Sequence, residues 1–125
     1  MENKWKNQNF FQSLKNAING IIYVIKTGRN IKIQITFAIL VIIAAIFFGV
    51  NNVEASILVL TIFFVLAAEF INTAIEKTVD MYTTEYNENA KTIKDVVAGA
   101  VTLTAVSSII IGVLIFLPKI LKYFS

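Results

Sequence analysis

Three long apolar stretches dominate the distribution of hydrophobic and polar positions along the chain. They cover about residues 33–50, 54–75 and 96–117, and the last one ends at Pro118. Each is long enough to cross a bilayer as a helix, which takes about 20 residues. The pattern predicts an all-α integral membrane protein in which three transmembrane helices form a single domain over residues 1–125.

A shorter segment, about residues 8–27, precedes the first span and has an amphipathic pattern. Its apolar residues recur every three or four positions: Phe10, Phe11, Leu14, Ala17, Ile18, Ile21, Ile22 and Ile25. This spacing predicts a helix that is too polar to span the membrane and that lies in the headgroup region. Packing against a soluble helix is the alternative interpretation, which the lack of a soluble core disfavours.

Basic residues are distributed unevenly about the three spans. Six precede the first span, three lie between the second and third, and two lie on the other side of the membrane. They are Lys4, Lys6, Lys15, Lys26, Arg29 and Lys32, then Lys77, Lys91 and Lys94, and finally Lys119 and Lys122. Because cytoplasmic segments carry an excess of lysine and arginine, we expect the N-terminus and the polar connection 77–95 to be cytoplasmic.

Composition restricts the chemistry that the chain can perform. The chain is 57% hydrophobic and 15% charged, and it contains neither cysteine nor histidine. Disulfides, thiolate nucleophiles and zinc-thiolate sites are therefore excluded, as are histidine bases and histidine metal ligands. Catalysis would have to rest on carboxylates, and a bound metal would be a hard ion such as Mg²⁺.

Carboxylates stand at the cytoplasmic end of the second span. Glu69, Asn72 and Glu76 are spaced by three and four residues, which places them on one face of a helix. An ionised side chain well inside a bilayer costs roughly 2.5–3.5 kcal/mol, so Glu69 is expected to have a function. An outer carboxylate that binds a metal with a nucleotide, and an inner one that takes a proton from a lipid hydroxyl, would suit phosphoryl transfer.

A second polar cluster, residues 85–95, brings Lys94 and Asp95 to the start of the third span. The lysine can meet phosphate, and the aspartate can accept from hydroxyl groups or brace the lysine. Other interpretations remain open: Glu76 as a solvated helix end, Lys94 and Asp95 as an interfacial anchor pair, and Glu69 as a contact between subunits. The residues alone allow a kinase, a transporter subunit or an assembly protein.

Three segments resemble the prokaryotic diacylglycerol kinase family, which includes the undecaprenol kinases. They are A-A-E-F-I-N-T-A-I-E-K-T-V-D (residues 67–80), E-Y-N-E-N-A-K-T-I-K-D (85–95) and G-I-I-Y-V-I-K-T-G-R-N (20–30). The resemblance implies a homotrimer of three-span subunits with an amphipathic surface helix and active sites shared between neighbours. It also implies ATP- and Mg²⁺-dependent phosphorylation of a lipid alcohol at the cytoplasmic side of the bacterial inner membrane, without a nucleic-acid partner.

The resemblance also implies roles for individual residues. Glu69 would be the base that activates the lipid hydroxyl, and Glu76 would be a metal ligand. The nucleotide site would be lined by Asn72, Glu76, Glu85, Tyr86, Asn87, Lys94 and Asp95.

Three positions depart from the family's pattern. Gly28 stands where the family's K-T-E-R-N motif has a second metal-binding glutamate, Asn16 replaces a tyrosine on the surface helix, and Asn87 replaces a histidine. We therefore expect Glu76 to hold Mg²⁺ with phosphates and water only. Restoring a carboxylate by Gly28→Glu should raise turnover at low Mg²⁺.

The choice of lipid follows from the same segments. The T-x-R-N-x-K-I motif and the 67–77 core look more like the Gram-positive branch, whose members favour undecaprenol. The prediction is an undecaprenol kinase. The alternatives are a diacylglycerol kinase that makes phosphatidic acid, and a catalytically weakened or non-enzymatic trimeric membrane protein.

Overall fold

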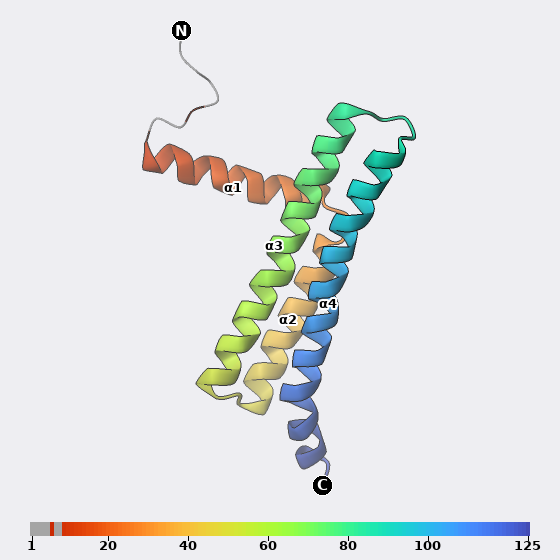
Figure 1. Ribbon diagram of the computed structural model, residues 1–125. Coiled ribbons are helices and arrows are strands. Elements are labelled where there is room, and N and C mark those ends of the chain that lie inside the picture. The colour runs from red at the N-terminus through yellow and green to blue at the C-terminus, as the bar shows by residue number, and fades with distance from the viewer. Residues whose placement is uncertain (1–5, 7–8) are drawn as a thin grey trace.

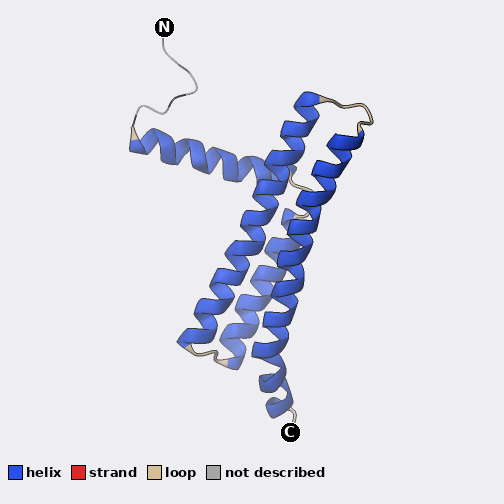
Figure 2. Ribbon diagram, in the orientation of Figure 1, coloured by secondary structure: helices blue, strands red, loops and turns tan. Residues whose placement is uncertain are grey.

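The computed structural model describes residue 6 and residues 9–125, and these form four helices (Figure 1). They are α1 (Phe10–Thr27), α2 (Ile31–Phe48), α3 (Asn52–Tyr82) and α4 (Glu88–Tyr123). Figure 2 shows short loops between the helices and no strand in the described part of the chain. The all-α prediction is confirmed, although the expected start of the first helix at residue 8 lies outside the described residues.

Helices α2, α3 and α4 form an elongated bundle, and α1 leaves one end of it at a steep angle to the bundle axis (Figure 1). Helix α3 packs mainly against α4 and less extensively against α2. Each of the three bundle helices is long and apolar enough to cross a membrane. The prediction of three helices able to span a membrane is confirmed.

Local capping signals determine where the helices begin and end. The Asn9 side chain accepts a hydrogen bond from Gln12 N (2.8 Å) at the start of α1. Asn51 and Glu54 form a reciprocal capping box at the start of α3. Between α2 and α3, Gly49 adopts φ 65°, a left-handed conformation that glycine accepts readily and that ends α2.

Two helices extend beyond the predicted spans. The connection predicted over 77–95 is largely helical, because α3 continues to Tyr82 and α4 already begins at Glu88. The change from apolar to polar residues marks where the chain leaves the membrane, and a helix can continue into water. Helix α4 also runs through Pro118 instead of ending there. Proline is tolerated in spanning helices because neighbouring groups can satisfy the backbone carbonyl that it leaves without a partner.

Most of the apolar surface of the single chain is exposed. In the most apolar parts of α2 and α4 only 6% of the residues are buried, and in α3 17%. Soluble monomers rarely expose apolar surface on this scale. The bundle faces must therefore be covered by lipid or by other protein chains.

Candidate active site

Glu69 lies in α3 with only 1% of its surface exposed, although it carries a carboxyl group. Its Oε2 accepts a hydrogen bond from Nε2 of Gln34 in α2 at 3.4 Å. The backbone of Asn30 also faces it, and the charges of Arg29 and Glu76 act on it from farther away. None of the ion pairs among the described residues includes Glu69. Burying a carboxylate without a paired cation is costly, so this position is consistent with a chemical role.

Asn72 and Glu76 continue the same face of α3 toward the end of the helix. Nδ2 of Asn72 donates to Oε1 of Glu76 at 3.3 Å, which confirms that the two share a face. Asn72 is buried, and its Oδ1 has no hydrogen-bond partner. An unpaired buried carbonyl oxygen is unfavourable on its own. The pair therefore offers a carboxylate and a free amide oxygen at one place.

The oxygen atoms of Glu76 and Asn72 can be compared with the ligands that Mg²⁺, the metal implied by the family resemblance, requires. Within the part of the chain that the structure describes, no three acidic side chains gather closely enough to hold a metal ion by themselves. Mg²⁺ commonly uses one or two carboxylates and completes its octahedron with phosphates and water. Glu76 and the free oxygen of Asn72 fit that requirement, and they fit it only together with a phosphate-bearing ligand.

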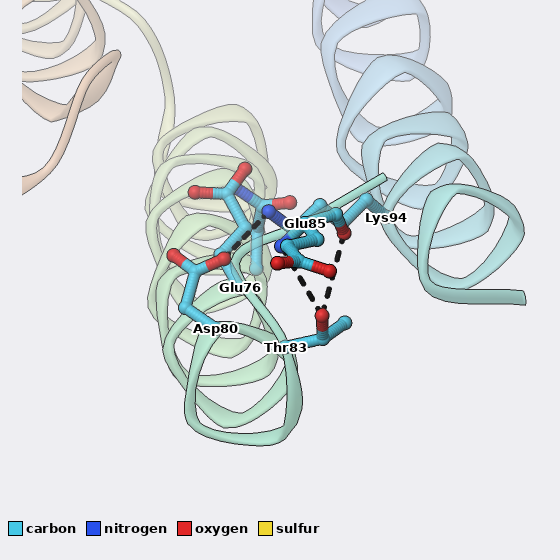
Figure 3. Close-up of polar contacts among 6 residues, drawn as sticks. Glu76, Asp80, Thr83, Glu85 and Lys94 are labelled. Atoms are coloured by element: carbon cyan, nitrogen blue, oxygen red, sulfur yellow. Dashed lines mark hydrogen bonds and ion pairs between the residues drawn. The ribbon is translucent and has the colours of Figure 1, made fainter. Parts of the chain in front are cut away.

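Lys94 joins this face from the neighbouring helix. Its Nζ lies 2.7 Å from Oδ1 of Asp80, one turn beyond Glu76 on α3. Figure 3 shows Lys94 reaching across from α4 to Asp80, with Glu76 beside them. The Glu69–Asp80 face of α3 thus ends at a lysine, as phosphate binding would require.

Asp95 does not join the Lys94–Asp80 pair. Its Oδ2 is engaged by Lys91 of the same helix at 2.6 Å, with both side chains more than half exposed. Bracing of Lys94, one of the two roles that the sequence allowed for Asp95, is therefore performed by Asp80 in this structure.

The loop 83–87 holds the remaining predicted residues. Glu85 N donates to Oγ1 of Thr83 at 3.1 Å, which forms a local turn in the loop (Figure 3). Tyr86 is 82% exposed. Asn87 accepts from Ala90 N at 3.0 Å and caps α4, a structural role that sequence reasoning missed. An asparagine directly before a helical pattern is the signal that would have found it.

Sequence reasoning also missed Gln34 and Asn30. Both line a groove of about 590 Å³ between α2, α3 and α4, which is otherwise mainly apolar. Gln34 stands near the beginning of a long uncharged run, and an isolated amide in such a run was the available signal. Gln34 connects this groove to the buried carboxylate, because it lines the groove and hydrogen-bonds to Glu69.

Comparisons with known proteins identify the family of this chain. The model of the family described as prokaryotic diacylglycerol kinase matches residues 15–116. The undecaprenol kinase of Bacillus subtilis is 41% identical over 111 residues, which cover 89% of this chain and 90% of the relative. The diacylglycerol kinase of Synechocystis is 35% identical over 123 residues, which cover 97% of this chain and 70% of the relative. The chain therefore belongs to the prokaryotic diacylglycerol kinase family and is a lipid kinase.

Proposed function

We propose that this kinase transfers the γ-phosphate of ATP to undecaprenol at the cytoplasmic face of the bacterial inner membrane. The observation that carries the proposal is the buried Glu69 carboxylate, which is hydrogen-bonded to Gln34 in the lining of a mainly apolar groove and is followed along α3 by Asn72 and Glu76, with Lys94 beside them. The 41% identity to an undecaprenol kinase over nine-tenths of both chains supports this substrate.

The residues divide the reaction between them. Glu69 accepts the proton of the lipid hydroxyl, the hydroxyl oxygen forms a bond to the γ-phosphorus, and the bond to the bridging oxygen breaks to release ADP. Lys94 neutralises phosphate charge. Glu76 and Asn72 would hold Mg²⁺, which supplies further charge neutralisation on the phosphates when bound. Glu85, Tyr86, Asn87 and Asp95 would complete the nucleotide site.

The placement in the membrane is part of the proposal. Helix α1 would lie in the cytoplasmic headgroup region, where Phe10 and Phe11, 74% and 80% exposed, could enter lipid. The excess of lysine and arginine at that end favours a cytoplasmic N-terminus. The largely exposed bundle faces support assembly into a homotrimer, in which a neighbour would close each site.

The test is phosphate transfer from labelled ATP by purified protein in mixed micelles. Undecaprenol and diacylglycerol are offered separately, each with and without Mg²⁺. We expect Mg²⁺-dependent product from undecaprenol. Glu69→Gln should lower the rate by about 10²- to 10⁴-fold, the usual contribution of a general base. The matched control is Glu88→Gln, an exposed carboxylate outside the site.

The oligomeric state is measured on the same samples. Wild type and Glu69→Gln should elute from size-exclusion chromatography as the same trimer, so that lost activity reports chemistry. Full activity of Glu69→Gln would contradict the assigned base.

Diacylglycerol is the second candidate substrate, because the Synechocystis relative with that activity in its name aligns over nearly the whole chain. Exclusive product from diacylglycerol would replace undecaprenol as the substrate and leave the assigned residues unchanged. Absence of product from both lipids would refute both substrate assignments.

A further inference from the structure

Gln34 is a polar residue in the spanning helix α2, and it has no role in the reaction proposed above. It is half-buried, and its Nε2 hydrogen-bonds to Glu69 at 3.4 Å across the contact between α2 and α3. Its Oε1 is buried and has no hydrogen-bond partner. A buried amide with one unpaired end is unfavourable, so its presence beside the proposed base needs an explanation.

A general base changes its hydrogen-bonding character during each turnover. The charged carboxylate only accepts hydrogen bonds, whereas the protonated acid also donates one. A glutamine amide carries a donor and an acceptor at its two ends, and rotation about its last torsion angle exchanges them. One glutamine can therefore hydrogen-bond to both forms of Glu69. Leucine can bond to neither form, and an ionised glutamate cannot donate to the charged form.

We propose that Gln34 is a positioning residue for the base Glu69, which it holds by hydrogen bonding before and after proton transfer. The inference rests on the proposed function. Before transfer, Nε2 donates to the carboxylate. During the reaction the O–H bond of the lipid alcohol breaks, an O–H bond forms on Glu69, and the alcohol oxygen bonds to the γ-phosphorus as ADP leaves. Oε1 of Gln34 then accepts from the new acid.

The surroundings of Glu69 favour Gln34 for this role. The charged groups that act on Glu69 within residues 9–125 are Glu76 of its own helix and Arg29 just before α2. Neither forms a hydrogen bond with it among the contacts of the described side chains, whereas Gln34 does. Gln34 also lines the groove in which the lipid would lie, so its amide sits where the hydroxyl must meet the base.

The test compares Gln34→Leu and the nearly isosteric Gln34→Met with Thr36→Val in the micelle assay. Thr36 lies on the same helix but not among the residues that line the groove, and its hydroxyl donates to the carbonyl of Lys32 at 2.8 Å, so its substitution is the matched loss of a polar group. Both Gln34 variants should lower kcat by about 10- to 100-fold, the usual effect of removing a partner that orients an active group. The KM values for ATP and lipid should stay near those of wild type, because ground-state binding is unchanged. Thr36→Val should keep the wild-type kcat.

The outcomes separate this inference from the proposed function. A Gln34→Leu enzyme with the kcat of Thr36→Val, or one with raised KM and unchanged kcat, would overturn the positioning role while wild-type activity upholds the kinase. If Gln34→Leu does not assemble, the nearly isosteric Gln34→Met decides: low kcat in an intact trimer supports the proposal, and wild-type kcat overturns it. An inactive wild-type protein would refute the proposed function itself.

Discussion

Lys77 donates a hydrogen bond of 2.9 Å from its Nζ to Oη of Tyr23, and the same nitrogen lies 4.6 Å from the centre of the tyrosine ring. The pair joins α1 to α3 directly after Glu76. Helix α1 otherwise points away from the bundle (Figure 1), so a contact at this position controls how α1 meets the helix that carries the site. The proposed nucleotide site lies beside this junction.

The hydrogen bond from Lys77 lowers the pKa of Tyr23 below its ordinary value. A lowered pKa contributes stability that is fully present above the unfolded-state pKa of tyrosine and is lost as the pH falls through the folded-state value. The contact itself consists of the hydrogen bond and the cation–π interaction.

Substitutions of Tyr23 should weaken the attachment of α1 to α3, and the effect should increase with the number of contacts removed. Tyr23→Phe removes the hydroxyl and keeps the ring below Lys77, whereas Tyr23→Leu removes both. We expect amide hydrogen exchange in α1 to be faster in Tyr23→Phe than in wild type and fastest in Tyr23→Leu. Exchange in the middle of α4 is the internal control and should not change. Equal exchange in α1 for all three proteins would show that the pair does not hold the helix.

Gly28 occupies a position that is closed to side chains in this structure. A Cβ atom there would lie 2.6 Å from the carbonyl oxygen of Val24 and 3.0 Å from Cγ2 of Ile31. Ile31 is 1% exposed, and Gly28 N already donates to Val24 O at 2.6 Å. Glycine is therefore needed for space, since its φ of −64° suits any residue. The Gly28→Glu substitution considered from sequence thus adds strain as well as a carboxylate.

Gly28→Ala is the control that separates these two effects. We expect it to destabilise the junction of α1 and α2 by about 1–3 kcal/mol, the usual cost of overpacking, and to lower the midpoint of thermal unfolding in detergent. Gly28→Glu should have a similar midpoint but a higher rate than Gly28→Ala at limiting Mg²⁺. Equal rates for the two variants over a Mg²⁺ titration would show that a carboxylate at this position does not reach the metal.

Lys94 and Asp80 should differ in importance although they form one ion pair. Lys94→Met removes a charged contact to phosphate, which is typically worth about 1.5–3 kcal/mol, so KM for ATP should rise by roughly 10- to 100-fold. Asp80→Asn should change KM only slightly, because the Lys94 and Asp80 side chains are 40% and 55% exposed and such pairs contribute at most about 1 kcal/mol. Steady-state kinetics with varied ATP measures both. An Asp80→Asn variant as impaired as Lys94→Met would place Asp80 in the nucleotide site.

The sequence was most informative where helical periodicity and chemistry coincided. The spacing of Asn72 and Glu76 predicted a shared face, and their hydrogen bond confirms it. The roles of the site residues remain predictions. The helix boundaries were less predictable, because hydropathy reports where the membrane ends and capping residues such as Asn87 decide where a helix starts.

Contacts between helices could not be predicted from the sequence. The pairing of Lys94 with Asp80, and of Asp95 with Lys91, depends on how α3 and α4 are rotated against each other, which no spacing within one helix reveals. Gln34 was overlooked for the same reason, since an amide in an apolar run becomes meaningful only when α2 places it against Glu69.

The opposite end of the bundle provides a test of stability that does not involve the site. Nζ of Lys119 in α4 lies 3.0 Å from Oε1 of Glu54 in α3, and the two side chains are only 26% and 21% exposed. Glu54 also accepts from Asn51 N at 3.1 Å within the capping box. Removing one partner of a largely buried ion pair should cost more stability than removing one partner of an exposed pair, because the other charge is then left buried without compensation.

Lys119→Met should therefore lower the thermal midpoint more than Glu54→Gln does. Methionine leaves the Glu54 charge partly buried and unpaired, whereas glutamine removes that charge and can still complete the capping box. The kcat of both variants should match wild type at temperatures well below the midpoint, because this end of the bundle is remote from Glu69. The double variant should unfold close to Glu54→Gln, because it no longer contains an unpaired charge, if the two residues act only as a pair. Midpoints that decrease additively would show that each residue is stabilised by other partners.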